Sequence, residues 1–153
     1  MPRAIRLQTS KGTEIPNSQE AEISAFHRNW SQRLVKQFPG VRFRTPASAM
    51  YNCHGLTFAS RRTNIDRTPA IQDILADDRY EPVDPREALP GDVVLYYSEE
   101  GEANHSGIVV EMPQDIKVPI ICSKWGTAGE VIHSLKRCPS AYGPTVKFFR
   151  CRL

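Results

Sequence analysis

The order of hydrophobic patterns along the chain restricts its fold more than any other sequence feature. In the first half, apolar side chains such as Ile23, Phe26 and Trp30 recur every three or four positions, which is the spacing of an amphipathic helix. After residue 90 the pattern changes to short apolar or alternating runs that are typical of strands. Because helices come first and strands follow, we expect an α+β domain whose N-terminal helices pack on an antiparallel β-sheet.

Turn and cap residues divide the chain further. We expect helices over residues 17–38, 52–62 and from 68 onward, one helical turn over 84–89, and strands over 92–97, 106–112, 118–123, 130–133 and 145–151. Asn17 or Ser18, Asn52 and Thr68 are the candidate N-caps of the three helices. Residues 1–16 are polar and irregular, so we expect a flexible arm there and a single domain over residues 17–153.

Composition excludes several classes of function. The net charge of +3 comes without a cluster of basic residues, so no nucleic-acid partner is expected. No apolar segment has the length of a signal peptide or a membrane span. We therefore expect no membrane partner, and either a cytoplasmic protein or one exported without a cleavable signal peptide. The four cysteines contain no Cys-x-x-Cys pair, which argues against a zinc ribbon or a thioredoxin-type site.

Two separate segments carry the parts of a cysteine nucleophile. Cys53 follows the candidate N-cap Asn52, and a thiol at the start of a helix has a lowered pKa. His105 opens an apolar strand and is the best-placed general base. His54 is a poorer candidate for the base, because neighbouring helical residues point about 100° apart. The pair of Cys53 and His105 predicts acyl-transfer chemistry.

The order of three motifs resembles the NlpC/P60 and CHAP group of papain-like cysteine peptidases. The motifs are Asn52-Cys53-His54-Gly55-Leu56, then Leu89-Pro90-Gly91-Asp92-Val93, then His105-Ser106-Gly107-Ile108-Val109. The resemblance covers roughly residues 50–123. It implies a papain-like fold and a thiol protease or amidase that hydrolyses an amide or isopeptide bond in a peptide or peptidoglycan-like substrate, without a cofactor or a metal.

The resemblance also assigns roles to residues. Cys53 would attack the carbonyl and His105 would carry the proton. The backbone N–H of Cys53, with Tyr51 or Asn52, would hold the oxyanion. A third polar residue on the next strand orients the histidine in such enzymes, and this chain offers Ser123 there, with His133 on the following strand as a second possibility. The remaining candidates for substrate contacts are His54, Lys124 and Trp125, and Trp125 suits a core position equally well.

Two other functions are compatible with the same residues. Cys53, His54 and His105, with Cys122 or His133, are residue types that bind zinc, although no compact ligand pair is present. A degraded catalytic triad on the same fold would give a non-catalytic binding module or a secreted effector toxin. The binding module is an alternative because Ser123 is a weak match for the third catalytic residue.

Overall fold

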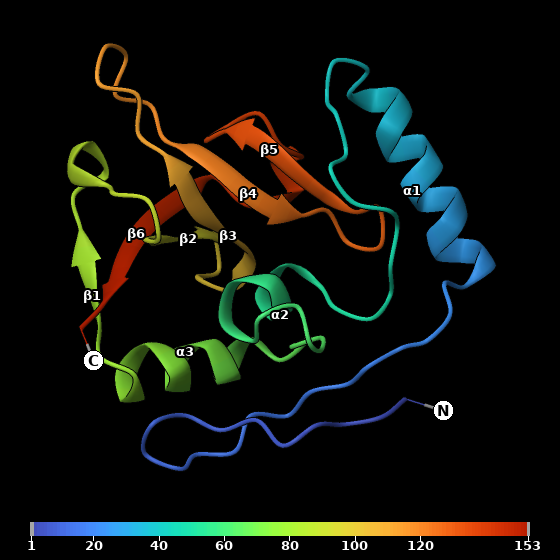
Figure 1. Cartoon of the computed structure of the whole chain (residues 1–153), viewed down its shortest axis with the longest axis horizontal. Helices are drawn as coiled ribbons and strands as arrows, with labels where there is room; N and C mark the ends of the chain where they lie inside the picture. Colours follow the sequence, from blue (N-terminus) through green and yellow to red (C-terminus); the bar gives the residue numbers. More distant parts are fainter. Residues whose placement is uncertain (1, 153) are drawn as a thin grey trace.

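A six-stranded antiparallel sheet forms the centre of the structure, which is a computed structural model that describes residues 2–152 (Figure 1). The strands are β1 (Tyr80–Val83), β2 (Val93–Tyr97), β3 (Ala103–Glu111), β4 (Ile120–Lys124), β5 (Glu130–Ser134) and β6 (Thr145–Cys151), in the spatial order β1-β6-β2-β3-β4-β5. Strands β2 to β5 form a meander, and β6 returns to pair with β2. The α+β class and the antiparallel sheet predicted from the sequence are confirmed.

Strand β1 was not expected from the sequence. Its four residues include Pro82 and lack an alternating apolar pattern, features that argue against a central strand. The strand lies at the edge of the sheet and pairs only with β6, and an edge strand tolerates proline because one side of its backbone needs no partner. Tertiary pairing with β6 therefore creates a strand that local sequence does not predict.

Three α-helices accompany the sheet: α1 (Ala25–Gln37), α2 (Cys53–Phe58) and α3 (Thr68–Asp77). Helix α1 begins at residue 25 rather than 17, because Ser24 is the cap that accepts a hydrogen bond from the His27 amide. Helix α2 ends at Phe58 rather than Arg62, since Ser60 and Arg61 have positive φ angles of 51° and 64°. Helix α3 is capped by Arg67, so Thr68 is its first helical residue and not its cap.

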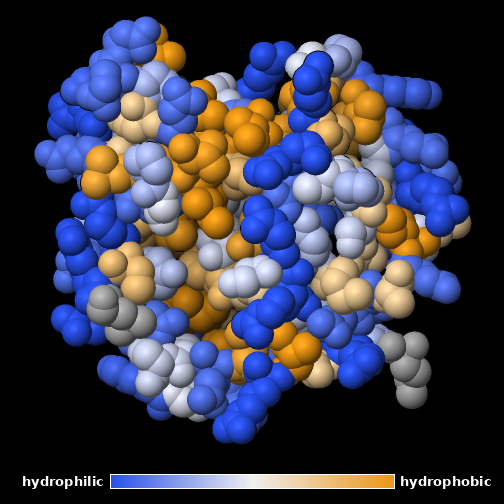
Figure 2. All heavy atoms as spheres, viewed as in Figure 1, coloured by the Kyte–Doolittle hydropathy of each residue, from blue (hydrophilic) through white to orange (hydrophobic). Residues whose placement is uncertain are grey.

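The sheet has an apolar core on each face. On one face, α2 and α3 pack against β1, β3 and β4, and Ile71 and Ile74 of α3 meet Leu95 of β2. The opposite face buries Val94, Tyr96, Val109, Ile121 and Phe148. Figure 2 shows apolar side chains gathered to the left of the centre of the face that is in view, beside a band of polar side chains that runs down the middle. Both faces of β2 are buried, which explains its continuous apolar sequence.

The N-terminal segment is hydrogen-bonded to the rest of the domain, although a flexible arm was expected over residues 1–16. It runs beneath α3 in Figure 1, and Thr9 and Thr13 both donate to the carboxylate of Asp77 at 2.6 Å. Ile15 is buried in the same core cluster as Ile71. The segment thus contacts the domain through these hydrogen bonds and one buried side chain.

The Pro-Gly-Asp motif has a structural role. Gly91 has a φ of +97°, a value that favours glycine, and it forms the turn into β2. Asp92 is buried and makes a two-pronged ion pair with Arg150 of β6, with both N–O distances at 2.8 Å, and it also accepts from the Leu89 amide. Burial acts to raise the pKa of Asp92, but these contacts outweigh it and lower that pKa. The same ion pair raises the pKa of Arg150. The motif fixes β2 between its neighbours and contributes no group to the candidate site.

Within residues 2–152, no helix combines the length and the apolar composition that crossing a bilayer requires.

Candidate active site

Cys53 is the first residue of helix α2, as the sequence predicts. Asn52 caps the helix: its side-chain oxygen accepts from the amides of Gly55 at 2.9 Å and Ile65 at 3.1 Å. The Asn52 amide group donates to the carbonyl of Ile65 at 3.0 Å and to Asp66 at 3.1 Å. Asn52 thus joins the start of α2 to the segment that follows the helix, and this fixes the backbone of Cys53.

Gly55 allows α2 to lie very close to that returning segment. A Cβ atom at this position would lie 1.8 Å from the carbonyl oxygen of Thr63. No side chain fits in that space, so glycine is required here for the approach of two backbones. The position of Cys53 therefore depends on close packing between α2 and residue 63.

His105 lies in β3 beside an irregularity in the sheet. Tyr96 of β2 pairs with His105, but Tyr97 pairs with Ala103, so Asn104 is an extra residue in β3. The His105 imidazole stacks on the ring of Tyr142, with ring centroids 3.7 Å apart and planes inclined by 8°. Its Nε2 atom is buried and has no hydrogen-bond partner among residues 2–152.

The thiol of Cys53 is buried and has a strongly perturbed pKa. Burial acts to raise the pKa, but the charges of the neighbouring His54 and His105 imidazoles outweigh this effect. The pKa of Cys53 therefore lies well below its usual value, which favours a thiolate at neutral pH. Helix α2 has only six residues, so the two histidines are the main cause of the shift. The structure thus brings together the cysteine and the histidine predicted from distant motifs.

His54 faces the sheet and is also buried. Its Nδ1 atom lies 2.8 Å from the hydroxyl oxygen of Ser106, and its Nε2 atom lies 2.9 Å from the carbonyl oxygen of Ala103. Burial acts to lower the pKa of His54, but Cys53 and the Ala103 carbonyl raise it above its usual value. Because both ring nitrogens have partners on β3, this side chain is fixed in place and is not free to rotate toward a substrate.

Ser123, the residue expected to orient His105, hydrogen-bonds to other residues. Its hydroxyl oxygen lies 2.7 Å from Nε2 of His133 and accepts from the Trp125 indole at 3.1 Å. Nδ1 of His133 donates to the carbonyl of Ser134 at 2.8 Å. Burial lowers the pKa of His133 to about 4, so His133 is neutral and accepts the Ser123 proton. Ser123 and His133 therefore satisfy each other, and neither hydrogen-bonds to His105.

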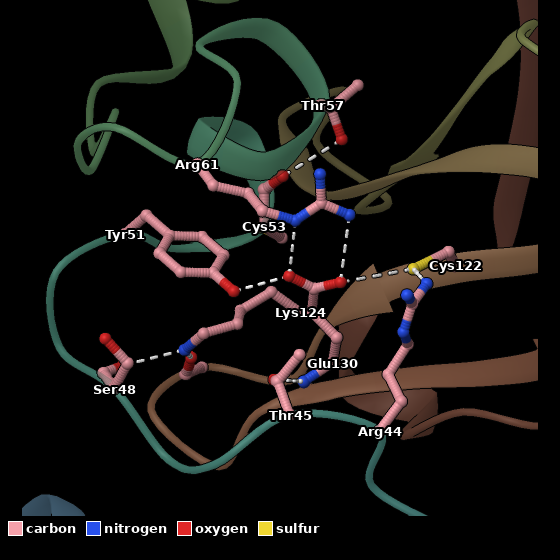
Figure 3. A network of polar contacts seen from close by, with 11 residues as sticks. Arg44, Thr45, Ser48, Tyr51, Cys53, Thr57, Arg61, Cys122, Lys124 and Glu130 are labelled. Atoms are coloured by element: carbon pink, nitrogen blue, oxygen red, sulfur yellow. Dashed lines mark hydrogen bonds and ion pairs between the residues drawn. The ribbon is translucent and has the colours of Figure 1, made fainter.

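A buried polar network supports the segment before Cys53 (Figure 3). The Glu130 carboxylate accepts hydrogen bonds from the Tyr51 hydroxyl and from Arg61, the latter at 2.7 and 3.1 Å. The Lys124 ammonium donates to the carbonyls of Ser48 at 2.7 Å and Gly126 at 2.5 Å, and lies 4.9 Å from the centre of the Tyr51 ring.

These contacts determine the charges in the network. Burial lowers the pKa of Lys124 to about 8 and, with the Glu130 contact, raises the pKa of Tyr51 to about 12. Burial acts to raise the pKa of Glu130, but Arg61 and Tyr51 lower it below its usual range. At neutral pH the Tyr51 hydroxyl is neutral, whereas Glu130 and Arg61 are charged. Tyr51 is fixed by Glu130 at its hydroxyl and by Lys124 at its ring.

Trp125 is fully buried and is not a substrate contact. Its ring packs edge-on against Phe38 at 5.0 Å and Phe43 at 5.8 Å, in a cluster that includes Leu34 and Val131. This is the core position that the sequence left open as an alternative. The cluster anchors the loop after β4 to the end of α1, and Gly126 in that loop lies directly against the ring of Trp30.

A groove of about 640 Å³ opens next to the start of α2. Its walls include the aromatic rings of Phe26 and Trp30 and the carboxyl-bearing residues Glu20, Glu22 and Asp66, and no lysine or arginine lines it. Tyr51 and Asn52, the two residues before Cys53, also line the groove. Pockets with an apolar wall and a few convergent polar groups are typical of ligand sites.

Some residues around the site were not predicted from the sequence. Tyr142 lies in a segment without a readable pattern, so nothing in the sequence places it against His105. The contacts of Ser106 with α2 follow from strand alternation, which puts Ser106 on the face opposite His105. Within residues 2–152, no three His, Cys, Asp or Glu side chains are arranged to hold a metal ion, so the geometry does not support the zinc hypothesis.

No family model, curated protein or solved structure matches this chain.

Proposed function

We propose that the chain is a cysteine-nucleophile hydrolase that cleaves an amide or isopeptide bond, with Cys53 as nucleophile and His105 as general acid and base. The observation that carries this proposal is a buried thiol whose pKa is lowered by two nearby imidazoles, those of His54 and His105. Perturbed pKa values of this kind concentrate at functional sites. A structural cysteine in apolar surroundings has a raised pKa instead, as the partly buried Cys138 has at about 11.

The chemistry follows from the positions of these groups. The Cys53 thiolate attacks the substrate carbonyl and forms a covalent acyl-enzyme through a tetrahedral oxyanion. The backbone N–H of Cys53, which has no acceptor within the helix, is placed to stabilise that oxyanion. His105 delivers a proton to the leaving amine, then takes one from the water that hydrolyses the thioester. Tyr142 orients the imidazole by stacking, a task that a polar third residue performs in many cysteine hydrolases.

The groove beside Tyr51 and Asn52 is the proposed substrate site. Tyr51 and Asn52, which line the groove, directly precede the nucleophile in the sequence. The aromatic wall of the groove suits an apolar side chain of a peptide. The carboxyl groups of Glu20, Glu22 and Asp66 favour a positively charged residue beside that apolar one. We therefore propose a peptide-like substrate with a basic residue close to the bond that is cleaved.

The arrangement also supports a papain-like core of the NlpC/P60 or CHAP type as the proposed family. A cysteine at the start of a helix packs against a strand that carries a histidine, and a meander of antiparallel strands follows the helices. This likeness rests on the ordered motifs and on the relative positions of α2 and β3. It extends the confirmed α+β class and is part of the proposal.

Hydrolysis of a peptide library tests the proposal. The library contains amide and isopeptide bonds, and mass spectrometry identifies the products. We expect cleavage by the wild type, none by Cys53→Ala or His105→Ala, and full cleavage by Cys122→Ala, a matched change at another buried cysteine. A covalent adduct of a peptidyl electrophile on Cys53 would identify the nucleophile independently. Cleavage that persists in Cys53→Ala would overturn the proposal.

A binding module on the same fold is the second candidate, and one observation favours it. Nε2 of His105 has no hydrogen-bond partner among the described residues, so no polar group holds the imidazole in position. A binding module retains peptide affinity in the groove but cleaves nothing. The same library distinguishes the two candidates, because a module binds peptides equally well with or without the thiol of Cys53.

A further inference from the structure

Proton counting around His54 determines its charge. The carbonyl oxygen of Cys53 can only accept a hydrogen bond. The Thr57 hydroxyl, 2.9 Å away, therefore donates its single proton to this oxygen. The Thr57 oxygen must then accept from Ser106, also at 2.9 Å, and this uses the single proton of Ser106. The Ser106 oxygen is left as an acceptor toward Nδ1 of His54 at 2.8 Å, so Nδ1 carries a proton.

The second ring nitrogen of His54 is protonated as well. Nε2 lies 2.9 Å from the carbonyl oxygen of Ala103, and a carbonyl can only accept. An imidazole with hydrogen on both nitrogens carries a positive charge. The chain of hydrogen bonds from Ala103 through His54, Ser106 and Thr57 to Cys53 is therefore satisfied only when His54 is an imidazolium.

A buried cation needs a nearby negative charge. His54 is 4% exposed, and burial of an unpaired imidazolium is strongly unfavourable because the charge loses its hydration. The groups that face it are Phe58 and Thr57 of α2, the Ala103 and Ser106 positions of β3, the thiol of Cys53 and, more distantly, Asp66. Cys53 is the acidic group whose charge acts most strongly on His54, so its thiolate is the counter-charge that makes the cation tolerable.

We propose that His54 is a fixed imidazolium that holds Cys53 as a thiolate, which leaves His105 free to transfer protons. His54 acts through Cys53 and is a positioning residue, because both of its N–H groups are committed to β3. The role of His105 in this proposal rests on the proposed hydrolase function, whereas the charge of His54 does not. The cationic state explains why an imidazole too constrained to act as a base lies beside the nucleophile.

Nuclear magnetic resonance of the full chain with ¹⁵N-labelled histidine tests the charge directly. At pH 7 we expect both ring nitrogens of His54 to carry protons, with the resonances assigned by their loss in His54→Gln. A neutral His54 with one unprotonated nitrogen would overturn the proposal. The measurement needs no substrate, so it can fail while the hydrolase function stands, and it can succeed while the hydrolase function fails.

The hydroxyl of Thr57 provides a second test that leaves both histidines and the thiol in place. In Thr57→Val the Ser106 proton can turn toward His54, so we expect His54 to titrate at a lower pH. The pH at which the rate of Cys53 alkylation falls to half its plateau value should then rise by about one unit, which is a tenfold change in the acid dissociation constant of the thiol. Thr63→Val is the matched control, because Thr63 is a buried threonine whose hydroxyl donates to Asn17, away from His54. Unchanged titration of His54 in Thr57→Val, or an equal effect of Thr63→Val, would contradict the relay.

Discussion

His105 stacks face to face on Tyr142, with ring centroids 3.7 Å apart and ring planes inclined by only 8°. The contact joins the strand that carries the proposed general base to a short 3₁₀ helix, Ser140–Tyr142, in the connection between β5 and β6. Because Ser123 and His133 hydrogen-bond to each other, the stack is the main contact that orients the His105 ring. The phenol ring thus takes the place of a polar third residue.

Truncation of Tyr142 tests this role. In Tyr142→Ala the imidazole loses its support, and we expect kcat to fall by about 100-fold, the typical cost of a small displacement of a catalytic group. Tyr142→Phe keeps the ring and removes only a hydroxyl that has no partner among the described residues, so kcat should change little. Steady-state kinetics of both variants give the comparison. Equal kcat values for the alanine variant and the wild type would exclude a role for the stack.

Alkylation of the cysteines tests the thiolate. In a Cys151→Ser background, which removes the exposed thiol, iodoacetamide at pH 6 should modify Cys53 ahead of Cys122 and Cys138. Burial raises the pKa of the latter two thiols, to about 11 for Cys138. The rate at Cys53 should stay constant through neutral pH and fall only as pH drops through its lowered pKa. A rate that rises steadily to pH 8 would show an ordinary thiol.

Gly55→Ala should destabilise the protein by about 3 kcal/mol, the upper range for an overpacked site. The added Cβ would lie 1.8 Å from the Thr63 carbonyl, and backbone cannot move aside as a side chain can. Gly40→Ala is the matched control, because the nearest atom there is the flexible end of Arg137. Urea unfolding of both variants measures the difference. A small effect at Gly55 would mean that α2 is less closely packed than the structure shows.

Stability at low pH depends on Asp92. Its folded-state pKa lies below the unfolded value of about 3.9, so its stabilisation is present above that value and is lost as pH falls through the folded pKa. Asp92→Asn should lower the unfolding free energy at pH 7, by about 3 kcal/mol for a broken buried pair. The deficit should shrink toward pH 2, where the wild type also loses the charge. A deficit that is independent of pH would argue that the ion pair with Arg150 contributes nothing.

Charge in the groove should set substrate preference. Glu20→Gln with Glu22→Gln should raise KM for lysine-containing peptides with little effect on kcat, because these residues bind substrate without touching the reacting bond. Asp73→Asn and Asp115→Asn, two carboxylates outside the groove, serve as controls. Binding of the same peptides to the Cys53→Ala variant can be measured by fluorescence anisotropy. Equal affinity for basic and acidic peptides would contradict the assigned specificity.

The sequence predicted the candidate site better than it predicted the boundaries of the elements. Asn52 was predicted as the cap and Cys53 as the first residue of its helix, because a cap and a helix start have local signatures. His105 was expected to open a strand, but β3 begins two residues earlier, at Ala103. Strand β1 was missed because Pro82 obscures it, and the start of α1 was misplaced because Ser24 competes with equally good caps at Asn17 and Ser18. The core position of Trp125 could not be separated from a groove position, since both suit an aromatic residue between polar turns.

The pattern of apolar residues by itself determined the α+β class, and local cap chemistry determined where Cys53 lies on its helix. Only the tertiary structure decided which imidazoles reach the thiol, that His54 has two acceptors on β3, and that Tyr142 lies on His105. The physical reason is that periodicity and capping act over a few residues. Hydrogen-bond directions and ring stacking depend instead on segments that are 49 to 52 residues apart for His54, and folding alone brings these segments together.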